Sequence, residues 1–360
     1  MSIARKHKTR LYNLGKPLIL NIGNIRTMLT DAGIPYGPIT LDNVSQDEAW
    51  LNTVEYLYAH ELVEQFLNVF IEVNDGVEDL VKLREEIERA SIDKMFPLLK
   101  SILRERADCV LFLGPEFLNW RVQREIYSFN RYFNLKLMQK LKDLDIDYEE
   151  IHKDDLSYMI HRFETKRKFV AGDTEQLAHT IYKSPGMIRD YYRHLPGFKL
   201  PLIINTNPDT VLSDEYPDQC ELATYDITNI APTPFPGLNE QKTLVYNIFG
   251  SFQNPPSILF TEKKAVEFTR NVYDPETSIP FQIKDLVRSS YCIFIGFNFN
   301  DWHFKILFDV LDLQKQPQNF AFYDINTQVK EQQIEYYERH YHMSFIKNDV
   351  EAMLEEILAI

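Results

Sequence analysis

The chain has few cysteines. Its 360 residues include only Cys109, Cys220 and Cys292. They are widely spaced, form no Cys-x-x-Cys pair and lie in mostly apolar, strand-like sequence. A structural zinc site or any other metal site is therefore not expected, and buried, reduced thiols are. Reduced thiols fit the cytoplasm.

Long apolar runs are also missing. No segment approaches the roughly 18 consecutive apolar residues of a membrane-spanning helix. The basic head of the chain, MSIARKHKTR, lacks the apolar run of a signal peptide. We therefore expect a soluble, unexported, cytoplasmic protein with no membrane partner.

Basic residues are outnumbered, with 39 Lys and Arg against 53 Asp and Glu, for a net charge of −14. Non-specific nucleic-acid binding depends mainly on Lys and Arg that neutralise phosphates. No nucleic-acid partner is therefore expected. The apolar content of 44% supports an ordinary packed core, and the length allows two domains.

Residues 1–92 have a helical pattern. The run NIGNIRTMLTDAG ends on Gly33, a typical helix stop. Ser45 and Glu48 form the capping box of the next helix, in which apolar residues recur at helical spacing. The sequence predicts a small all-helical domain over 1–92.

The pattern changes at CVLFLG, which starts at Cys109. Short apolar runs now end in polar or glycine-bearing turns, and helical sequence, the first piece over about 116–169, separates them. The runs are CVLFLG, LPLIINTNPD, TLVYNIFGS, YCIFIGFNFND and NFAFYDI. Strands that alternate with helices predict an α/β domain over 95–360, with a Rossmann-like doubly wound parallel sheet. Ligands of such sheets bind beyond the carboxyl ends of the strands, so the turns after the first four runs are the candidate site.

These four turns, in this order, resemble the sirtuin-like family, in particular its zinc-free prokaryotic branch found in anti-phage defence proteins. The segments that carry the resemblance are IINTNPD, PPSILFTEKKAVEF and IFIGFNFNDWHFKIL. In residues 1–92 the segments NIRTMLTDAGIP and AWLNTVEYLYAHELVEQFLNVFIEVND resemble, more loosely, the death-fold-like adaptor domains appended to effectors in bacterial conflict systems. Those adaptor domains associate with partners of their own kind. A helical cap on the sheet domain is the alternative for 1–92.

The resemblance implies an NAD site. Its first turn would hold the pyrophosphate on backbone N–H groups, but here Pro115 has no N–H and Glu116 adds a carboxylate. A unit charge about 5 Å from a phosphate costs roughly 3 kcal/mol at an effective dielectric of about 20. In the alternative, Glu116 simply opens a helix. The implied cofactor-binding positions are Gly114, Glu116, Asn207, Asp209, Gly250, Gly296 and Asn298.

Two of these positions have a second interpretation. The resemblance places Asn207 and Asp209 near the nicotinamide-side ribose. The sequence TNPD is also a good turn by itself, stabilised by side-chain hydrogen bonds to the backbone. Asp301, which follows Asn298, fits the N-cap of the next helix.

Phe249 stands where the family has the histidine that acts as general base. A phenyl ring has no lone pair and no titratable proton. Losing a positioned base lowers a rate by about 10² to 10⁴. We therefore expect a pseudoenzyme in which Asn207 is a vestigial catalytic residue. His303 is the candidate replacement base, although an ordinary core or surface histidine explains it as well.

Two functions are carried forward. The first is a catalytically inactive binding or scaffold subunit of a prokaryotic defence or similar multi-protein assembly. It has protein partners or self-associates, and no cofactor is certain. Its old pocket is filled by Phe249 and Phe117 or suits another ligand. The alternative is a divergent NAD hydrolase, an NAD-depleting effector, with NAD or ADP-ribose as the ligand.

Overall fold

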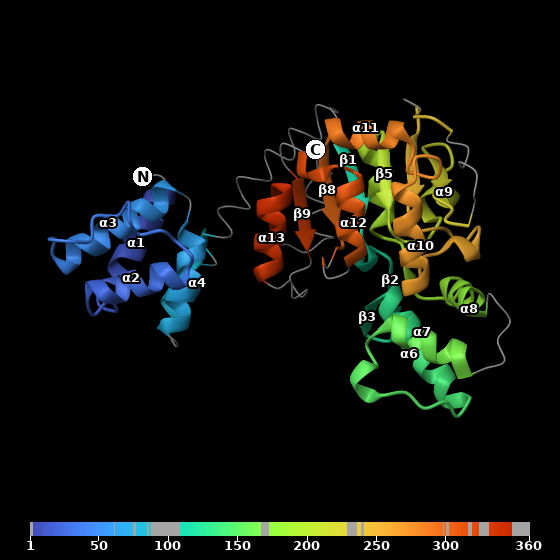
Figure 1. Ribbon diagram of the computed structural model, residues 1–360, viewed down its shortest axis with the longest axis horizontal. Helices are drawn as coiled ribbons and strands as arrows, with labels where there is room; N and C mark the ends of the chain where they lie inside the picture. The colour runs from blue at the N-terminus through green and yellow to red at the C-terminus, as the bar shows by residue number, and fades with distance from the viewer. Residues whose placement is uncertain are drawn as a thin grey trace. The chain divides into compact units, whose positions relative to one another are not determined.

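The chain divides into two compact units. In the computed structural model, unit 1 is Met1–Leu99 and unit 2 is Lys100–Ile360. Each unit is described by itself (Figure 1). The structure describes residues 3–60, 62–74, 77–84, 86–87, 109–166, 173–228, 236–238, 241–297, 299, 302–315, 319–323 and 331–347.

Unit 1 is helical in the part that the structure describes. Asn21 caps the second helix, and Ser45 caps the third by accepting a hydrogen bond from the Glu48 N–H at 3.2 Å. The expected stop at Gly33 is confirmed, because the second helix ends just before it and Gly33 has a φ of 66°. Residues 78–84 and 86–87 are also helical, and the helices with described bounds are α1 (Ile3–Gly15), α2 (Ile22–Asp31), α3 (Gln46–Ala59) and α4 (Val63–Val73).

Trp50 on α3 is at the centre of the unit 1 core. Its ring lies 5.8 Å from that of Phe66 and 5.6 Å from that of Phe70, both on α4. Its indole N–H donates to the Tyr12 carbonyl on α1 at 3.0 Å. One buried side chain therefore joins three helices, and its polar atom is satisfied.

Unit 2 is built on a parallel sheet. Among its described residues seven strands pair in the order β10-β9-β8-β1-β5-β7-β6, and every pair is parallel. This is the predicted α/β, Rossmann-like doubly wound class, with an all-helical region before it. The strands are β1 (Cys109–Leu113), β5 (Leu202–Asn205), β6 (Cys220–Thr224), β7 (Thr243–Asn247), β8 (Tyr291–Ile295), β9 (Asn319–Tyr323) and β10 (Met343–Lys347).

The five predicted strands are present as β1, β5, β7, β8 and β9. The sequence analysis missed β6 and β10, which lie at the two ends of the strand order. β6 is half-buried over most of its length, and its sequence CELAT has no continuous apolar run. An end strand that is only partly covered needs fewer apolar residues, which is why the apolar pattern does not reveal it.

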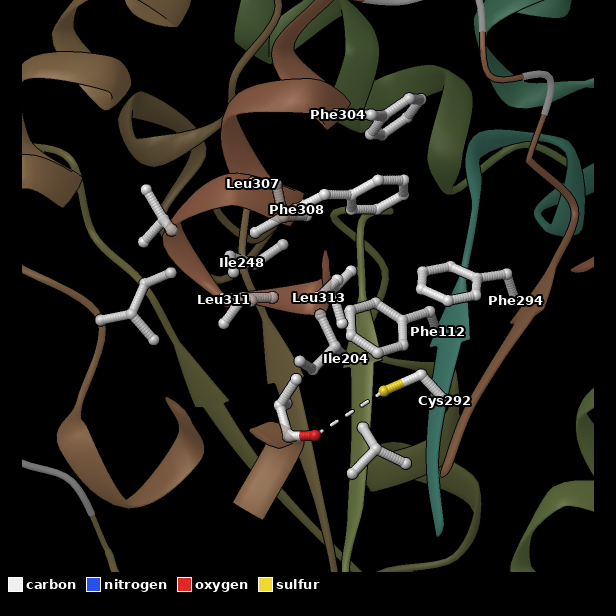
Figure 2. Close-up of a cluster of buried hydrophobic side chains, with 14 of the residues drawn as sticks. Phe112, Ile204, Ile248, Cys292, Phe294, Phe304, Leu307, Phe308, Leu311 and Leu313 are labelled. Atoms are coloured by element: carbon white, nitrogen blue, oxygen red, sulfur yellow. Dashed lines mark hydrogen bonds between the residues drawn. The ribbon is translucent and has the colours of Figure 1, made fainter. Parts of the chain in front are cut away.

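Helices flank the sheet, and one face carries a large apolar core (Figure 2). Ile204, Phe112 and Phe294 are register partners on β5, β1 and β8, so their side chains form one row. The Phe112 and Phe294 rings stack 4.4 Å apart. The helices that follow the sheet strands are α9 (Val211–Glu215), α10 (Glu262–Tyr273), α11 (Phe281–Ser289), α12 (Trp302–Val310) and α13 (Glu331–Tyr341).

A subdomain is inserted between β1 and β5, and here the helix predicted over 116–169 is wrong at its start. Residues 119–128 form two strands instead. Trp120 pairs with Tyr127 across them, and both strands contain the aromatic and β-branched side chains that favour strands. The inserted subdomain, residues 117–188, contains β2 (Asn119–Val122), β3 (Glu125–Ser128), α6 (Phe129–Asp143), η2 (Glu150–His152), α7 (Leu156–Lys166), α8 (Asp173–Tyr182) and β4 (Met187–Ile188).

Candidate functional site

Four turns meet at the carboxyl edge of the sheet, as the sequence predicted. They follow β1, β5, β7 and β8, which are neighbours in the strand order. From β1 the chain continues to β5 on one side and later returns to β8 on the other. The switch point between β1 and β8 is where doubly wound sheets bind their ligands.

Two glycines bring the turns after β1 and β8 into direct contact. A Cβ on Gly114 would lie 2.3 Å from the Gly296 carbonyl oxygen, closer than real Cβ atoms come. Gly296 has a φ of 75°, and a Cβ there would lie 2.7 Å from the Phe117 nitrogen. Both positions therefore need glycine because one backbone packs against the other.

The same contact uses the N–H groups that a phosphate would need. The Gly114 N–H donates to the Ile295 carbonyl at 2.7 Å, and the Glu116 N–H to the Gly296 carbonyl at 2.9 Å. The Phe117 N–H donates to the Gly114 carbonyl at 3.0 Å, and Pro115 has none.

A pyrophosphate does not fit this turn. The turn runs into η1 (Pro115–Phe117), a short 3₁₀ helix that has Glu116 in its first turn. Glu116 thus lies where a helix favours an acid, in line with the structural alternative for this residue. With the N–H groups of the turn donated within the protein and a carboxylate beside them, the residues present do not suit the phosphates of NAD.

Asn207 connects the turn after β5 to the turn after β1. The residue is 3% exposed, and its Nδ2 donates to the Gly114 carbonyl at 2.8 Å. Its backbone N–H donates to Asn205 Oδ1 at 3.0 Å, which is a side-chain-stabilised turn. These hydrogen bonds agree with the second interpretation of Asn207, in which the residue stabilises the turn.

Asp209 is a buried carboxyl group with three donors. Its Oδ1 accepts from the Val211 N–H at 3.1 Å, while its Oδ2 accepts from the Tyr192 hydroxyl at 3.1 Å and from Asn205 Nδ2 at 3.0 Å. Burial raises the pKa of Asp209 above its ordinary value, and the three hydrogen bonds act in the opposite direction. Burial, followed by the charge of Asp209, also raises the pKa of Tyr192.

The sequence analysis did not single out Asn205 and Asn247, which are register partners at the ends of β5 and β7. Asn247 is 0% exposed, and its Nδ2 donates to the Asp209 carbonyl at 2.7 Å. Its Oδ1 has no hydrogen-bond partner among the residues that the structure describes. An asparagine at the end of a mainly apolar, buried strand was the available signal.

Phe249 is a core residue. Its side chain is 5% exposed, and its ring lies 5.1 Å from that of Phe268 on α10 and 6.1 Å from that of Phe304 on α12. The His303 ring lies 5.3 Å away, edge to face. Gly250 follows with a φ of 89°, and a Cβ on it would lie 2.3 Å from the Ser257 carbonyl oxygen.

The sequence analysis also named Phe117, Asn298 and Asp301. Phe117 is 1% exposed, and its ring packs edge to face on Tyr192 at 5.0 Å. Asn298 and Asp301 lie outside the described residues. The structure therefore brings Gly114, Glu116, Asn207, Asp209, Phe249, Gly250 and Gly296 to one edge of the sheet.

The cysteines agree with the sequence prediction, since all three are free and buried. Burial raises the pKa of Cys109 to about 12. Across the described ranges, no cluster of three or more His, Cys, Asp or Glu residues is arranged to hold a metal ion. Over the same ranges, no helix combines the length and apolar character needed to cross a membrane.

Residues 201–346 match the SIR2-like domain family. The match begins at Pro201, just before β5, so it includes the turns of Asn207, Phe249 and Gly296 but not that of Gly114. Comparison with curated proteins gave no match for the chain. The SIR2-like match within unit 2 supports assignment of this domain to a sirtuin-like family.

Proposed function

We propose that the protein is a catalytically inactive sirtuin-like protein that acts as a binding or scaffold subunit. The observation that carries this proposal is Phe249. At the position of the family's general base, a phenyl ring is buried among core side chains, and it offers no proton acceptor.

The turn after β1 supports the proposal independently. Its N–H groups are donated within the protein, and Asn207 is bonded to the same turn. These contacts support the proposal, because the turn after β1 donates its N–H groups within the protein and position 249 itself offers no base.

The partners that we propose are proteins, including further copies of this chain. The loose resemblance of unit 1 to adaptor domains and that of unit 2 to proteins of anti-phage defence suggest a prokaryotic defence or similar multi-protein assembly. Sedimentation of the full chain over a range of concentrations tests self-association. A species of constant monomer mass would contradict self-association and leave other protein partners as the proposal.

Divergent NAD hydrolysis is the second candidate, and one contact favours it. The ring of His303 lies beside Phe249, so an imidazole is present next to the position of the absent histidine. This candidate needs the turn after β1 to rearrange, because its N–H groups are otherwise donated within the protein.

Incubation of the full chain with NAD separates the two functions. We expect no release of nicotinamide, because no described residue acts as a base in a site that also fits the phosphates. We also expect none from Phe249→His, since that variant restores an imidazole but not the phosphate cradle. The measurement is chromatographic detection of nicotinamide.

Asn207→Ala and His303→Ala provide the controls. Turnover by the unmodified chain that both substitutions abolish would replace the scaffold proposal with the hydrolase. Turnover gained only in Phe249→His would show that the cradle binds NAD and that the base alone was missing. Isothermal calorimetry with NAD and with ADP-ribose measures binding separately from chemistry.

A further inference from the structure

The segment that follows Phe249 also contacts the inserted subdomain. We call residues 249–264 the bridge segment. It begins after β7, contains η4 (Pro255–Ser257) and ends in the first turn of α10. Phe249 at its start packs in the sheet core, whereas later residues reach α6 and α8.

Aromatic rings form the apolar part of this contact. Phe252 is 4% exposed, and its ring stacks on that of Tyr182 of α8 at 4.4 Å. The same ring meets Phe129 of α6 edge to face at 5.6 Å, and the Phe260 ring lies 5.4 Å from that of Phe133. Aromatic pairs of this kind add about 0.5–1.5 kcal/mol each beyond the area that they bury.

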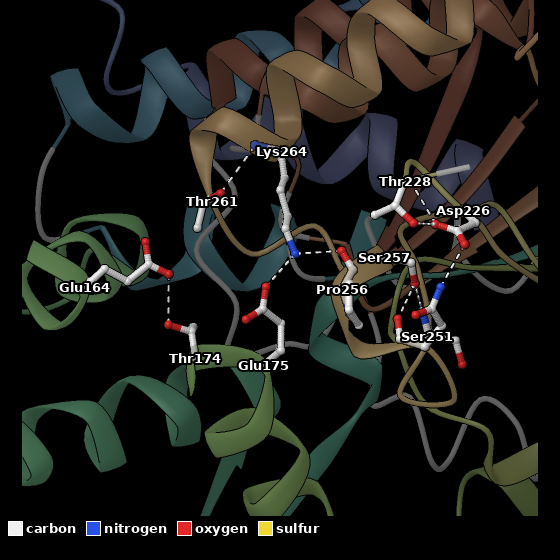
Figure 3. A network of polar contacts seen from close by, with 11 residues as sticks. Glu164, Thr174, Glu175, Asp226, Thr228, Ser251, Pro256, Ser257, Thr261 and Lys264 are labelled. Atoms are coloured by element: carbon white, nitrogen blue, oxygen red, sulfur yellow. Dashed lines mark hydrogen bonds and ion pairs between the residues drawn. The ribbon is translucent and has the colours of Figure 1, made fainter. Parts of the chain in front are cut away.

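An ion pair forms the polar part (Figure 3). Lys264 Nζ lies 2.6 Å from Glu175 Oε1 on α8, and it also donates to the Pro256 carbonyl at 2.8 Å. The two side chains are only 18% and 15% exposed. Within the inserted subdomain, the Lys153–Glu150 pair has side chains that are 43% and 75% exposed. The Lys264–Glu175 pair is therefore much less accessible to water than the Lys153–Glu150 pair.

Helix α8 in turn contacts the turn that carries Asn207 and Asp209, through Tyr182. The Tyr182 hydroxyl accepts a hydrogen bond from the Thr210 N–H at 3.2 Å. Tyr182 is itself 7% exposed. Movement of α8 away from the sheet would break this hydrogen bond, the stacking on Phe252 and the Lys264–Glu175 pair together.

We propose that Lys264 and Glu175 form a latch that holds α8 closed over the carboxyl edge of the sheet, and that solvent and ligands reach this edge when the latch opens. The expected effect of a substitution on α8 follows from the burial of the Lys264–Glu175 pair. Removing one partner leaves the other charge largely buried without its counter-ion, whereas replacing both with apolar side chains avoids that cost.

Hydrogen exchange of the full chain tests the latch. Lys264→Met and Glu175→Met are each expected to speed amide exchange in α8 by about tenfold, which corresponds to about 1.4 kcal/mol. The double variant is expected to return to the rate of the unmodified chain. Glu175→Gln, which keeps an acceptor oxygen, should increase the exchange rate of α8 less. This variant replaces the methionine variants in the test if they fold poorly.

The matched control is Lys153→Met, which breaks the exposed pair of the inserted subdomain and should leave α8 unchanged. Unaltered α8 exchange in the single variants would overturn the latch. Equal acceleration in β1 and β5 would overturn it too, because unit 2 would then be opening as a whole. Failure of the double variant to recover would show that the ion pair does not set the opening. The readout does not depend on NAD, so it stands apart from the proposed function.

Discussion

Gly296→Ala is expected to destabilise unit 2 by about 4 kcal/mol, the largest effect that we predict. Two costs add. A left-handed backbone costs a non-glycine residue about 1–2 kcal/mol, and overpacking costs typically about 1–3 kcal/mol. Here the new Cβ would lie 2.7 Å from the Phe117 nitrogen, a backbone atom that cannot turn aside. Scanning calorimetry of the full chain measures the loss.

Two other glycines separate these costs. Gly237 also has a positive φ, of 89°, but apart from its chain neighbours no atom of the described residues lies within 4 Å of its Cβ position, so Gly237→Ala should show the backbone cost alone. Gly114 has a φ of −86°, and its Cβ would lie 2.3 Å from the Gly296 carbonyl oxygen, so Gly114→Ala should show the clash alone. If Gly296→Ala cost no more than Gly237→Ala, the two turns would not be tightly packed.

Asp209→Ala is expected to destabilise unit 2 by about 3 kcal/mol or more. The substitution leaves the Tyr192 hydroxyl, the Asn205 amide and the Val211 N–H without their acceptor in a buried place. Each unsatisfied buried group costs about 1–3 kcal/mol. Urea unfolding measures the change, and Asp214→Ala on the part-buried neighbour that bonds Thr210 is the milder comparison.

Asp209 also predicts a pH dependence. Its pKa is raised in the folded protein, whereas an unfolded aspartate titrates near about 3.9. Between that pH and the native pKa, this carboxyl group is deprotonated in the unfolded chain but protonated in the folded one. Its contribution to the free energy of unfolding therefore falls as the pH rises through this window. Above the native pKa the contribution is constant.

The test compares the unmodified chain with Asp209→Asn, which does not titrate. The free energy of unfolding of the unmodified chain, relative to the asparagine variant, should fall as the pH rises from about 4. A rise over the same range would mean that the hydrogen bonds outweigh burial and hold the pKa of Asp209 below its ordinary value.

Local sequence was enough to predict the sheet and the position of its turns. The strands that lead to the turns at Gly114, Asp209, Gly250 and Gly296 are mainly apolar and almost fully buried, as strands covered on both faces need to be. The cap at Ser45 could likewise be predicted, because its hydrogen bond spans three residues. The residue type at position 249 was also sufficient to exclude a base there.

The tertiary structure decided which donors and acceptors are hydrogen-bonded to one another within the protein. Asn207 and the Gly114 carbonyl are 93 residues apart in sequence, and Lys264 and Glu175 are 89 apart. Such partners are chosen by the packing of the sheet and the inserted subdomain, and no local pattern encodes them. The strands β2 and β3 escaped the sequence analysis for a different reason. Their pairing is local, but NWRV and EIYS are short and lack the continuous apolar run by which the strands of the large sheet were recognised. The sequence therefore located the edge of the sheet, and the three-dimensional packing decided that its turns bond to one another.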